Sequence, residues 1–335
     1  LPTVFLQLGS NYTDVASAAL LLTAIAFVLG PLQRTQLLLA GIAIGLFLGS
    51  KPSAPVAAAL LAAVLAVRAY RAGRRGAIPV AWLLALLLGG GTYAMNVVRH
   101  HNPVWPVRVD VGGLHMPGLR SMSELLHSAT AAPHLAGSLP SRVLRSWTTI
   151  CPPLPIYDMR IGGLGLLFLV ALPFAVVRVL RSRSPAVWLC FGAALATPDP
   201  AVTRYVLGFA GLVLAFAVPA VGRLAPRRRL AAMTTAALLA AHGLWVAYPG
   251  LTGEGPPLHT YPGLDDAQRR GALGADGPPW RFVEVMDALP PGAVTVFDAA
   301  AELPYLAWPH DMSHRAIWIP DDVTPEQARA LIAGP

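Results

Sequence analysis

Residues 36–70 read QLLLAGIAIGLFLGSKPSAPVAAALLAAVLAVRAY, and this stretch decides the expected fold. Two apolar runs, 36–50 and 54–70, flank a short polar connection that contains Lys51. Long apolar runs without acidic residues are typical of membrane-spanning helices or of fully buried ones. Glycines recur every four residues in the first run, at Gly41, Gly45 and Gly49, and this spacing permits close packing against a second helix.

Similar apolar runs follow one another along most of the chain. They predict eight transmembrane helices, at about 12–30, 36–50, 54–70, 78–97, 162–180, 184–197, 201–221 and 230–248. The composition agrees, because 55% of the 335 residues are hydrophobic, only 13% are charged, and the mean hydropathy is +0.56. Average soluble domains carry about 25% charged residues. The composition therefore argues against an ordinary soluble enzyme and against a disordered chain.

Arginines cluster after every second predicted helix. They are Arg34; Arg68, Arg71, Arg74 and Arg75; Arg178, Arg181 and Arg183; and Arg223, Arg227, Arg228 and Arg229. Cytoplasmic loops of membrane proteins are rich in Arg and Lys, so this alternation places both chain ends outside the cytoplasm. We expect an integral membrane protein, of a bacterial inner membrane, that binds membrane lipid and no nucleic acid.

The charge balance divides the chain into two expected domains. Residues 1–248 carry a net charge of +15 and form the transmembrane domain, with a long outer loop at 98–161. Residues 249–335 carry a net charge of −7 and alternate between helix and strand patterns. The tail is predicted to be a small α/β extracytoplasmic domain.

Within this tail the pattern predicts a helix ending near 289, a buried strand at 293–297, a short helix near 300–307 and a strand at 316–319. The last helix begins at Pro325, with Thr324 and Gln327 forming a capping box. No strand pattern follows it, and Leu1 is not a methionine. We therefore expect the domain to be incomplete and the chain to be truncated at both ends.

Asp14 and Lys51 are the most informative charged residues. Asp14 is the only acid in residues 1–109 and opens the first apolar run. It is either a carboxylate favoured at a helix N-terminus or a site carboxylate that acts as a catalytic base, an acceptor ligand or a metal ligand. Lys51 is the only lysine beside 24 arginines and lies on the side where topology does not favour positive charge. It is either a snorkelling lysine or a phosphate ligand.

Other candidate ligands lie at the same outer edge. They are Arg99, His100 and His101 after the fourth run, Asp158 and Arg160 before the fifth, and Arg204 and Tyr205 at the start of the seventh. Lys51, Arg99, Arg160 and Arg204 form a predicted outward-facing basic ring suited to a lipid phosphate or pyrophosphate. The adjacent histidines do not share a helix face, and His310 and His314 lie in a predicted loop, so no metal site is predicted.

Several short motifs occur in an order that resembles a known family. They are Pro2-Thr3-Val4, Gln7 and Asn11-Tyr12-Thr13-Asp14; the glycine-rich segment from Gly41 to Lys51; Asn102-Pro103-Val104-Trp105-Pro106; and Thr203-Arg204-Tyr205-Val206-Leu207. In this order they resemble membrane glycosyltransferases of the GT-C superfamily. The related members are the dolichyl-phosphate-mannose protein mannosyltransferases and the bacterial lipopolysaccharide-core transferases. An outward-facing C-terminal domain is also common in this family.

The resemblance implies a reaction class. Family members transfer a hexose or pentose from a polyprenyl-phosphate donor to a lipid, glycan or protein acceptor on the outer face of the membrane. A carboxylate deprotonates the acceptor, and basic residues hold the carrier phosphate. The family's principal catalytic acid lies in an earlier outer loop, and Asp14 matches a later family aspartate, so this chain by itself is expected to be inactive. A divalent cation is left open, because family members differ in this requirement.

Two other functions fit the same residues. A transporter or flippase of a lipid-linked anionic substrate would use the same helices and the same basic ring, although no internal repeat is evident. A non-catalytic membrane scaffold with an outer interaction domain is the third. An acidic motif in an outer loop upstream of Leu1 would favour the enzyme.

Overall fold

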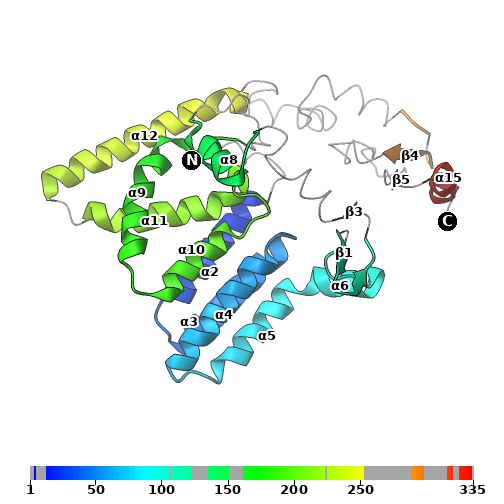
Figure 1. The fold of residues 1–335 in the computed structure, drawn as a ribbon, viewed down its shortest axis with the longest axis horizontal. Helices are drawn as coiled ribbons and strands as arrows, with labels where there is room; N and C mark the ends of the chain where they lie inside the picture. Colours follow the sequence, from blue (N-terminus) through cyan, green and yellow to red (C-terminus); the bar gives the residue numbers. More distant parts are fainter. Residues whose placement is uncertain are drawn as a thin grey trace. The chain divides into compact units, whose positions relative to one another are not determined.

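The computed structural model describes residue 4 and residues 13–105, 107–118, 120–121, 135–150, 161–222, 225–252, 288–290, 292–297, 315–319 and 324–333. These residues are mostly α-helical (Figure 1). The chain divides into two compact units, Leu1–Tyr248 and Pro249–Pro335.

The first unit is built mainly from helices. They are α2 (Asp14–Leu29), α3 (Arg34–Ser50), α4 (Pro55–Arg71), α5 (Ala77–Gly89), α6 (Gly91–His100), α8 (Leu139–Thr148), α9 (Gly165–Arg181), α10 (Pro185–Leu195), the 3₁₀ helix η1 (Thr203–Val206), α11 (Leu207–Gly222) and α12 (Pro226–Thr252). Proline occupies the first turn of α4 and α10, where its missing N–H leaves no intrahelical bond unmade.

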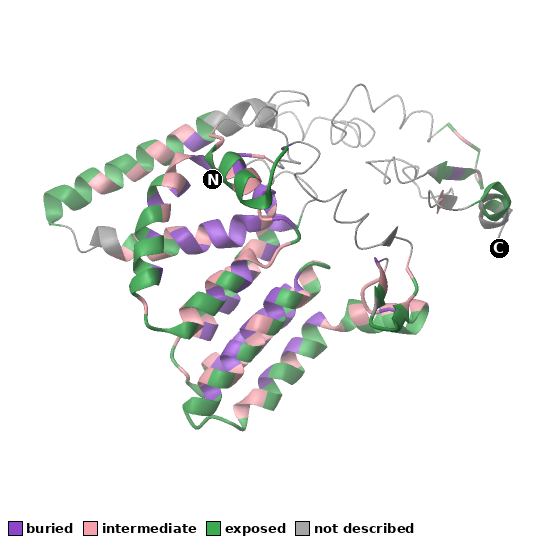
Figure 2. Ribbon diagram, viewed as in Figure 1, coloured by how far each residue is buried: buried purple, intermediate pink, exposed green. Residues whose placement is uncertain are grey.

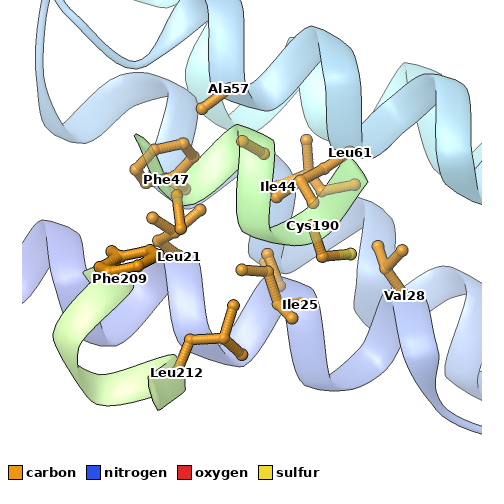
Figure 3. Packing of buried hydrophobic residues seen from close by; sticks show 14 of the residues in the cluster. Leu21, Ile25, Val28, Ile44, Phe47, Ala57, Leu61, Cys190, Phe209 and Leu212 are labelled. Atoms are coloured by element: carbon orange, nitrogen blue, oxygen red, sulfur yellow. The ribbon is translucent and has the colours of Figure 1, made fainter. Parts of the chain in front are cut away.

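The hydrophobic core lies between α2, α3, α4, α10 and α11. Helix α3 packs on α2 and α5, α10 packs on α4, and α11 packs on α2 and α9. Figure 3 shows Ile25, Ile44, Leu61 and Phe209 meeting in this core, and each is less than a tenth exposed. Figure 2 shows the contrast with α12, whose described side chains are mostly exposed or half-buried.

The glycines of α3 allow an unusually close contact with α5. A Cβ atom at Gly41 would lie 2.4 Å from the carbonyl oxygen of Ala81, and one at Gly45 would lie 2.7 Å from that of Ala85. A Cβ atom at Gly89 would lie 2.2 Å from the carbonyl oxygen of Gly45. The predicted role of the glycine spacing in close helix packing is confirmed.

The predicted fold class, an α-helical polytopic membrane protein with about eight transmembrane helices, is wrong. Within the described residues, no single helix is long and apolar enough to cross a membrane. In the part of the chain that the structure describes, only the pair α5 and α6 has the required length and composition, and it is bent by 61°.

The apolar runs form helices near their expected positions, and most of those helices are short. Helix α2 has 16 residues, α3 and α4 have 17 each, and α10 has 11. At 1.5 Å per residue, 17 residues extend only about 26 Å, against a hydrocarbon core of about 30 Å. Helix α12 is longer, with 27 residues, but its first turn carries Arg227, Arg228 and Arg229. The run 78–97 breaks at Gly90, and the run 201–221 begins as a 3₁₀ turn.

The segment 98–161 contains short strands and α8. Strands β1 (Val107–Val111), β2 (Leu114–Met116) and β3 (Arg120–Ser121) form a sheet in the order β2-β1-β3, in which β1 is antiparallel to β2 and parallel to β3. The fully buried Asn102 holds this corner, because its Nδ2 donates to the carbonyls of Val107, at 2.6 Å, and Pro117, at 2.7 Å.

In the second unit, β4 (Val294–Phe297) pairs in parallel with β5 (Arg315–Trp318). The two predicted strands are confirmed. However, the first is not buried as expected, because Val294 and Val296 are 41% and 46% exposed. The two predicted helices near 282–289 and 300–307 fall almost entirely outside the described residues.

The last helix, α15 (Pro325–Ala333), begins with the predicted capping box. The backbone N–H of Thr324 donates to Gln327 Oε1 at 2.8 Å, and the N–H of Gln327 donates to Thr324 Oγ1 at 3.3 Å. This reciprocal pair satisfies N–H groups that a helix start otherwise leaves unpaired.

Candidate functional site

A small pocket of about 50 Å³ lies in the first unit, where the start of α2 and the ends of α3 and α10 meet η1. Its apolar lining is mostly alanine, namely Ala18, Ala54, Ala57, Ala193, Ala194 and Ala196. Its polar lining consists of Asp14, Ser17, Lys51, Ser53, Thr197, Arg204 and Tyr205. Lys51 keeps 22% of its side chain exposed, so the pocket is reached from outside the protein.

Asp14 is the first residue of α2, and only 3% of it is exposed. The helix N-terminus favours a carboxylate at this position. Its Oδ1 atom accepts a hydrogen bond from the Lys51 ammonium, and its Oδ2 atom lies 4.0 Å from Arg204 Nε. The carboxylate therefore meets two cations from two other elements.

Lys51 directly follows α3, where an extended backbone and Pro52 end that helix. Its ammonium also lies 4.8 Å from the centre of the Tyr205 ring, which supports it through a cation–π contact. Burial and the neighbouring Arg204 guanidinium lower the pKa of Lys51 from 10.5 to about 8. Its charge therefore changes close to physiological pH.

Arg204 and Tyr205 belong to η1, which the buried Val202 and Val206 fix in the core. The Arg204 guanidinium donates to the Tyr205 hydroxyl at 3.4 Å and lies 5.2 Å from the ring centre. Tyr205 thus contacts both cations of the pocket.

Three hydroxyl groups hold the end of α3 against its neighbours. Ser50 Oγ donates to the Phe47 carbonyl at 2.7 Å and is 2.7 Å from Ser17 Oγ, which connects α2 with α3. The Tyr93 hydroxyl of α6 donates to the carbonyls of Leu48, at 3.2 Å, and Lys51, at 3.3 Å. These bonds fix the backbone from which Lys51 reaches Asp14.

Helix α8 supports the loop between α10 and η1. The Ser146 hydroxyl donates to the carbonyl of Ala201 at 2.6 Å, and the Trp147 indole donates to that of Pro200 at 2.8 Å. Within the loop, the backbone N–H of Ala201 donates to Asp199 Oδ1 at 2.9 Å. The loop leads directly into Arg204 and Tyr205, so these bonds fix one wall of the pocket.

The pocket residues carry more positive than negative charge. Two cations, Lys51 and Arg204, face one carboxylate, Asp14, in a site with little access to water. Charges interact strongly where water is excluded. A bound anion would balance the excess positive charge, and a phosphate accepts hydrogen bonds from both lysine and arginine.

The structure brings together four of the candidate residues from the sequence, Asp14, Lys51, Arg204 and Tyr205. Ser17 and Thr197 also line the pocket, although the sequence pattern did not single them out. Ser17 follows Asp14 by three residues and therefore shares its helix face, a signal that was available. Thr197 lies in the segment Thr-Pro-Asp-Pro, which indicates only a turn.

The other candidates lie elsewhere or outside the described residues. Arg99 is exposed at the end of α6, His100 stacks on Trp105 with ring centres 4.1 Å apart, and His101 ends the helix with φ 54°. None of these three residues lines the pocket. Asp158 and Arg160 fall within 151–160, which the structure does not describe.

A metal centre finds no support in the described part of the chain, where no three His, Cys, Asp or Glu residues gather closely enough to hold an ion. Comparisons with protein-family models, with curated proteins and with solved structures find no match to this chain. Function must therefore be inferred from the geometry of the pocket.

Proposed function

We propose that this protein is a glycosyltransferase that takes a sugar from a polyprenyl-phosphate donor, and that the pocket binds the donor phosphate. One observation carries the proposal: Asp14, Lys51 and Arg204, from three elements far apart in the sequence, line one small pocket with excess positive charge. The resemblance of the surrounding motifs to GT-C enzymes supports the same reaction class.

The transfer would proceed by displacement of the phosphate. The acceptor hydroxyl oxygen bonds to the anomeric carbon of the sugar, and the bond from that carbon to the phosphate oxygen breaks. The departing phosphate gains negative charge, which Lys51 and Arg204 stabilise. Asp14 holds the two cations in place and is the pocket's candidate for receiving the proton of the acceptor.

Apolar side chains on the helix surfaces support contact with a lipid-borne donor. Leu86 and Leu87 of α5 are 63% and 69% exposed, and Phe174 and Leu180 of α9 are 57% and 64% exposed. Large exposed apolar areas mark sites of contact with membranes or other proteins. We propose that these helices face lipid, which would bring the polyprenyl chain to the protein.

The first prediction concerns the two cations. Lys51→Ala and Arg204→Ala should each weaken binding of a polyprenyl phosphate in detergent micelles about tenfold or more, because a hydrogen bond to a charged group contributes about 1.5–3 kcal/mol. Dissociation constants can be measured by titration, with the uncharged polyprenol as the ligand control. Arg74→Ala is the matched protein control, since Arg74 is an exposed arginine outside the pocket.

Two outcomes would argue against the proposal. Equal affinity of the wild type for polyprenyl phosphate and polyprenol would show that the pocket does not bind phosphate. Normal phosphate binding together with movement of a polyprenyl-phosphate sugar across a vesicle bilayer would replace the enzyme with the transporter.

A further inference from the structure

Thr197 contributes an unusual polar group to the pocket. It follows the end of α10, and its backbone N–H donates to the Leu195 carbonyl at 2.8 Å. Its side-chain oxygen Oγ1 is buried and has no hydrogen-bond partner among the residues that the structure describes. The side chain nevertheless lines the pocket that contains Lys51 and Arg204.

A buried hydroxyl without a partner destabilises a folded protein, because the group gives up its bonds to water. Thr203 also has a buried hydroxyl oxygen without a hydrogen-bond partner among the described residues, but Thr203 does not line the pocket. The two threonines therefore share the energetic penalty and differ in access to a bound ligand. A ligand in the pocket could pair with the Thr197 hydroxyl, whereas no ligand in that pocket would contact Thr203.

We propose that the Thr197 hydroxyl donates a hydrogen bond to an oxygen of the phosphate bound by Lys51 and Arg204. This inference rests on the proposed function and adds a third ligand, from the end of α10, to those from the end of α3 and from η1. A neutral hydroxyl adds a directed hydrogen bond without adding further repulsion between cations.

The size of the pocket favours phosphate over sugar as the partner of Thr197. A volume of about 50 Å³ holds only a few water molecules. A phosphate group, with four oxygens around one phosphorus, is of comparable size, whereas a hexose ring is considerably larger. The sugar and the polyprenyl chain would therefore extend beyond the pocket, and Thr197 lies where the phosphate would be held.

The second prediction compares two isosteric substitutions. Thr197→Val should weaken binding of both polyprenyl phosphate and inorganic phosphate about tenfold, whereas Thr197→Ser should retain most of the affinity. Thr203→Val should leave both affinities unchanged. Each valine variant should unfold at the same temperature as the wild type or higher, since it removes an unpaired buried hydroxyl. Titration and thermal unfolding of the full chain measure the two effects.

The outcomes separate this inference from the proposed function. If the wild type does not bind polyprenyl phosphate, the proposed function fails. If the wild type binds and Thr197→Val binds equally well, only the role of Thr197 is refuted. A lower unfolding temperature for Thr197→Val would also refute it, because that result indicates a structural role. Loss of polyprenyl phosphate binding with unchanged inorganic phosphate binding would show that Thr197 contacts the lipid, contrary to the inference.

Discussion

Lys51 is the residue whose charge state should control the pocket. Burial and Arg204 lower its pKa from 10.5 to about 8, although the Asp14 carboxylate is in contact with it. The lysine is protonated below that value and can then pair with a phosphate. Above it, a growing fraction of the protein presents a neutral amine, which attracts an anion only weakly.

The third prediction follows from this lowered pKa. Affinity for polyprenyl phosphate should fall as the pH rises from about 7.5 to about 9.5, approaching tenfold per unit above pH 8. The phosphate itself does not cause this change, because its second pKa is about 6. Lys51→Arg should flatten the profile, since an arginine stays charged throughout. An equally steep profile in Lys51→Arg would contradict the assignment.

Stability should respond to the same group with the opposite sign. The folded state releases its lysine proton near pH 8, whereas the unfolded chain keeps it to about 10.5. The unfolded state therefore binds more protons between these values, and the Lys51 contribution to the free energy of unfolding rises with pH across that range. In the free protein, the Lys51 contribution to stability thus grows over the same pH range in which phosphate binding weakens.

Charge made part of the pocket predictable from the sequence. Asp14, Lys51 and Arg204 are conspicuous because charged residues are rare in the apolar segments around them. Thr197 and Ser17 carry no such signal, since hydroxyl residues are common in helices and turns. Arg99 is conspicuous for the same reason as Lys51, but a residue's rarity does not tell which elements the fold brings together.

At the scale of elements, the contact between α3 and α5 depends on glycine. A side chain at Gly45 would meet the carbonyl oxygen of Ala85 at 2.7 Å, within backbone that has no room to move aside. Gly192 of α10, in contrast, is exposed, and a Cβ atom at that position would have nothing within 4 Å. These two helical glycines therefore differ only in what surrounds them.

The fourth prediction uses this pair. Gly45→Ala should lower the free energy of unfolding by about 1–3 kcal/mol, because the added methyl overpacks the helix contact. Gly192→Ala should raise it by about 0.5–1 kcal/mol through the higher helix propensity of alanine. Chemical denaturation of both variants measures the difference. Equal effects of the two substitutions would show that α3 and α5 are not in close contact.

The sequence pattern predicted the positions of most helices. It did not predict their exact bounds or the hydrogen bonds that their arginines make. From the sequence, Arg68 is a topology signal after an apolar run. In the structure its guanidinium donates to the carbonyls of Val28 and Gly30, the latter at 3.3 Å. Arg68 thus satisfies carbonyls that the end of α2 would otherwise leave unpaired. An arginine at a helix end can therefore serve local hydrogen bonding to carbonyl groups as well as membrane topology.

For the whole molecule, composition could not distinguish a helix that crosses a membrane from one that is buried by its neighbours. Both are apolar and poor in charge. The difference depends on helix length and on breaks such as that at Gly90, which position-by-position hydropathy does not resolve. The capping box at Thr324 was predictable because it depends on residues three positions apart, whereas the α3–α5 contact joins segments far apart in sequence.

The last prediction concerns the exposed apolar surface of the whole chain. Leu83, Leu86 and Leu87 of α5 are 56%, 63% and 69% exposed, and burying such a side chain contributes about 1.5–3 kcal/mol. We therefore expect the full chain to float with vesicles of zwitterionic phosphatidylcholine, which exclude attraction by lipid charge. Leu86→Gln with Leu87→Gln should lower the vesicle partition coefficient tenfold or more with little change in unfolding free energy. Arg74→Gln, an exposed substitution in the connection between α4 and α5, should leave partitioning unchanged. A wild-type chain that stays monodisperse without detergent and does not float would show that these helix faces do not contact lipid, and the donor would then have to reach the pocket by another route.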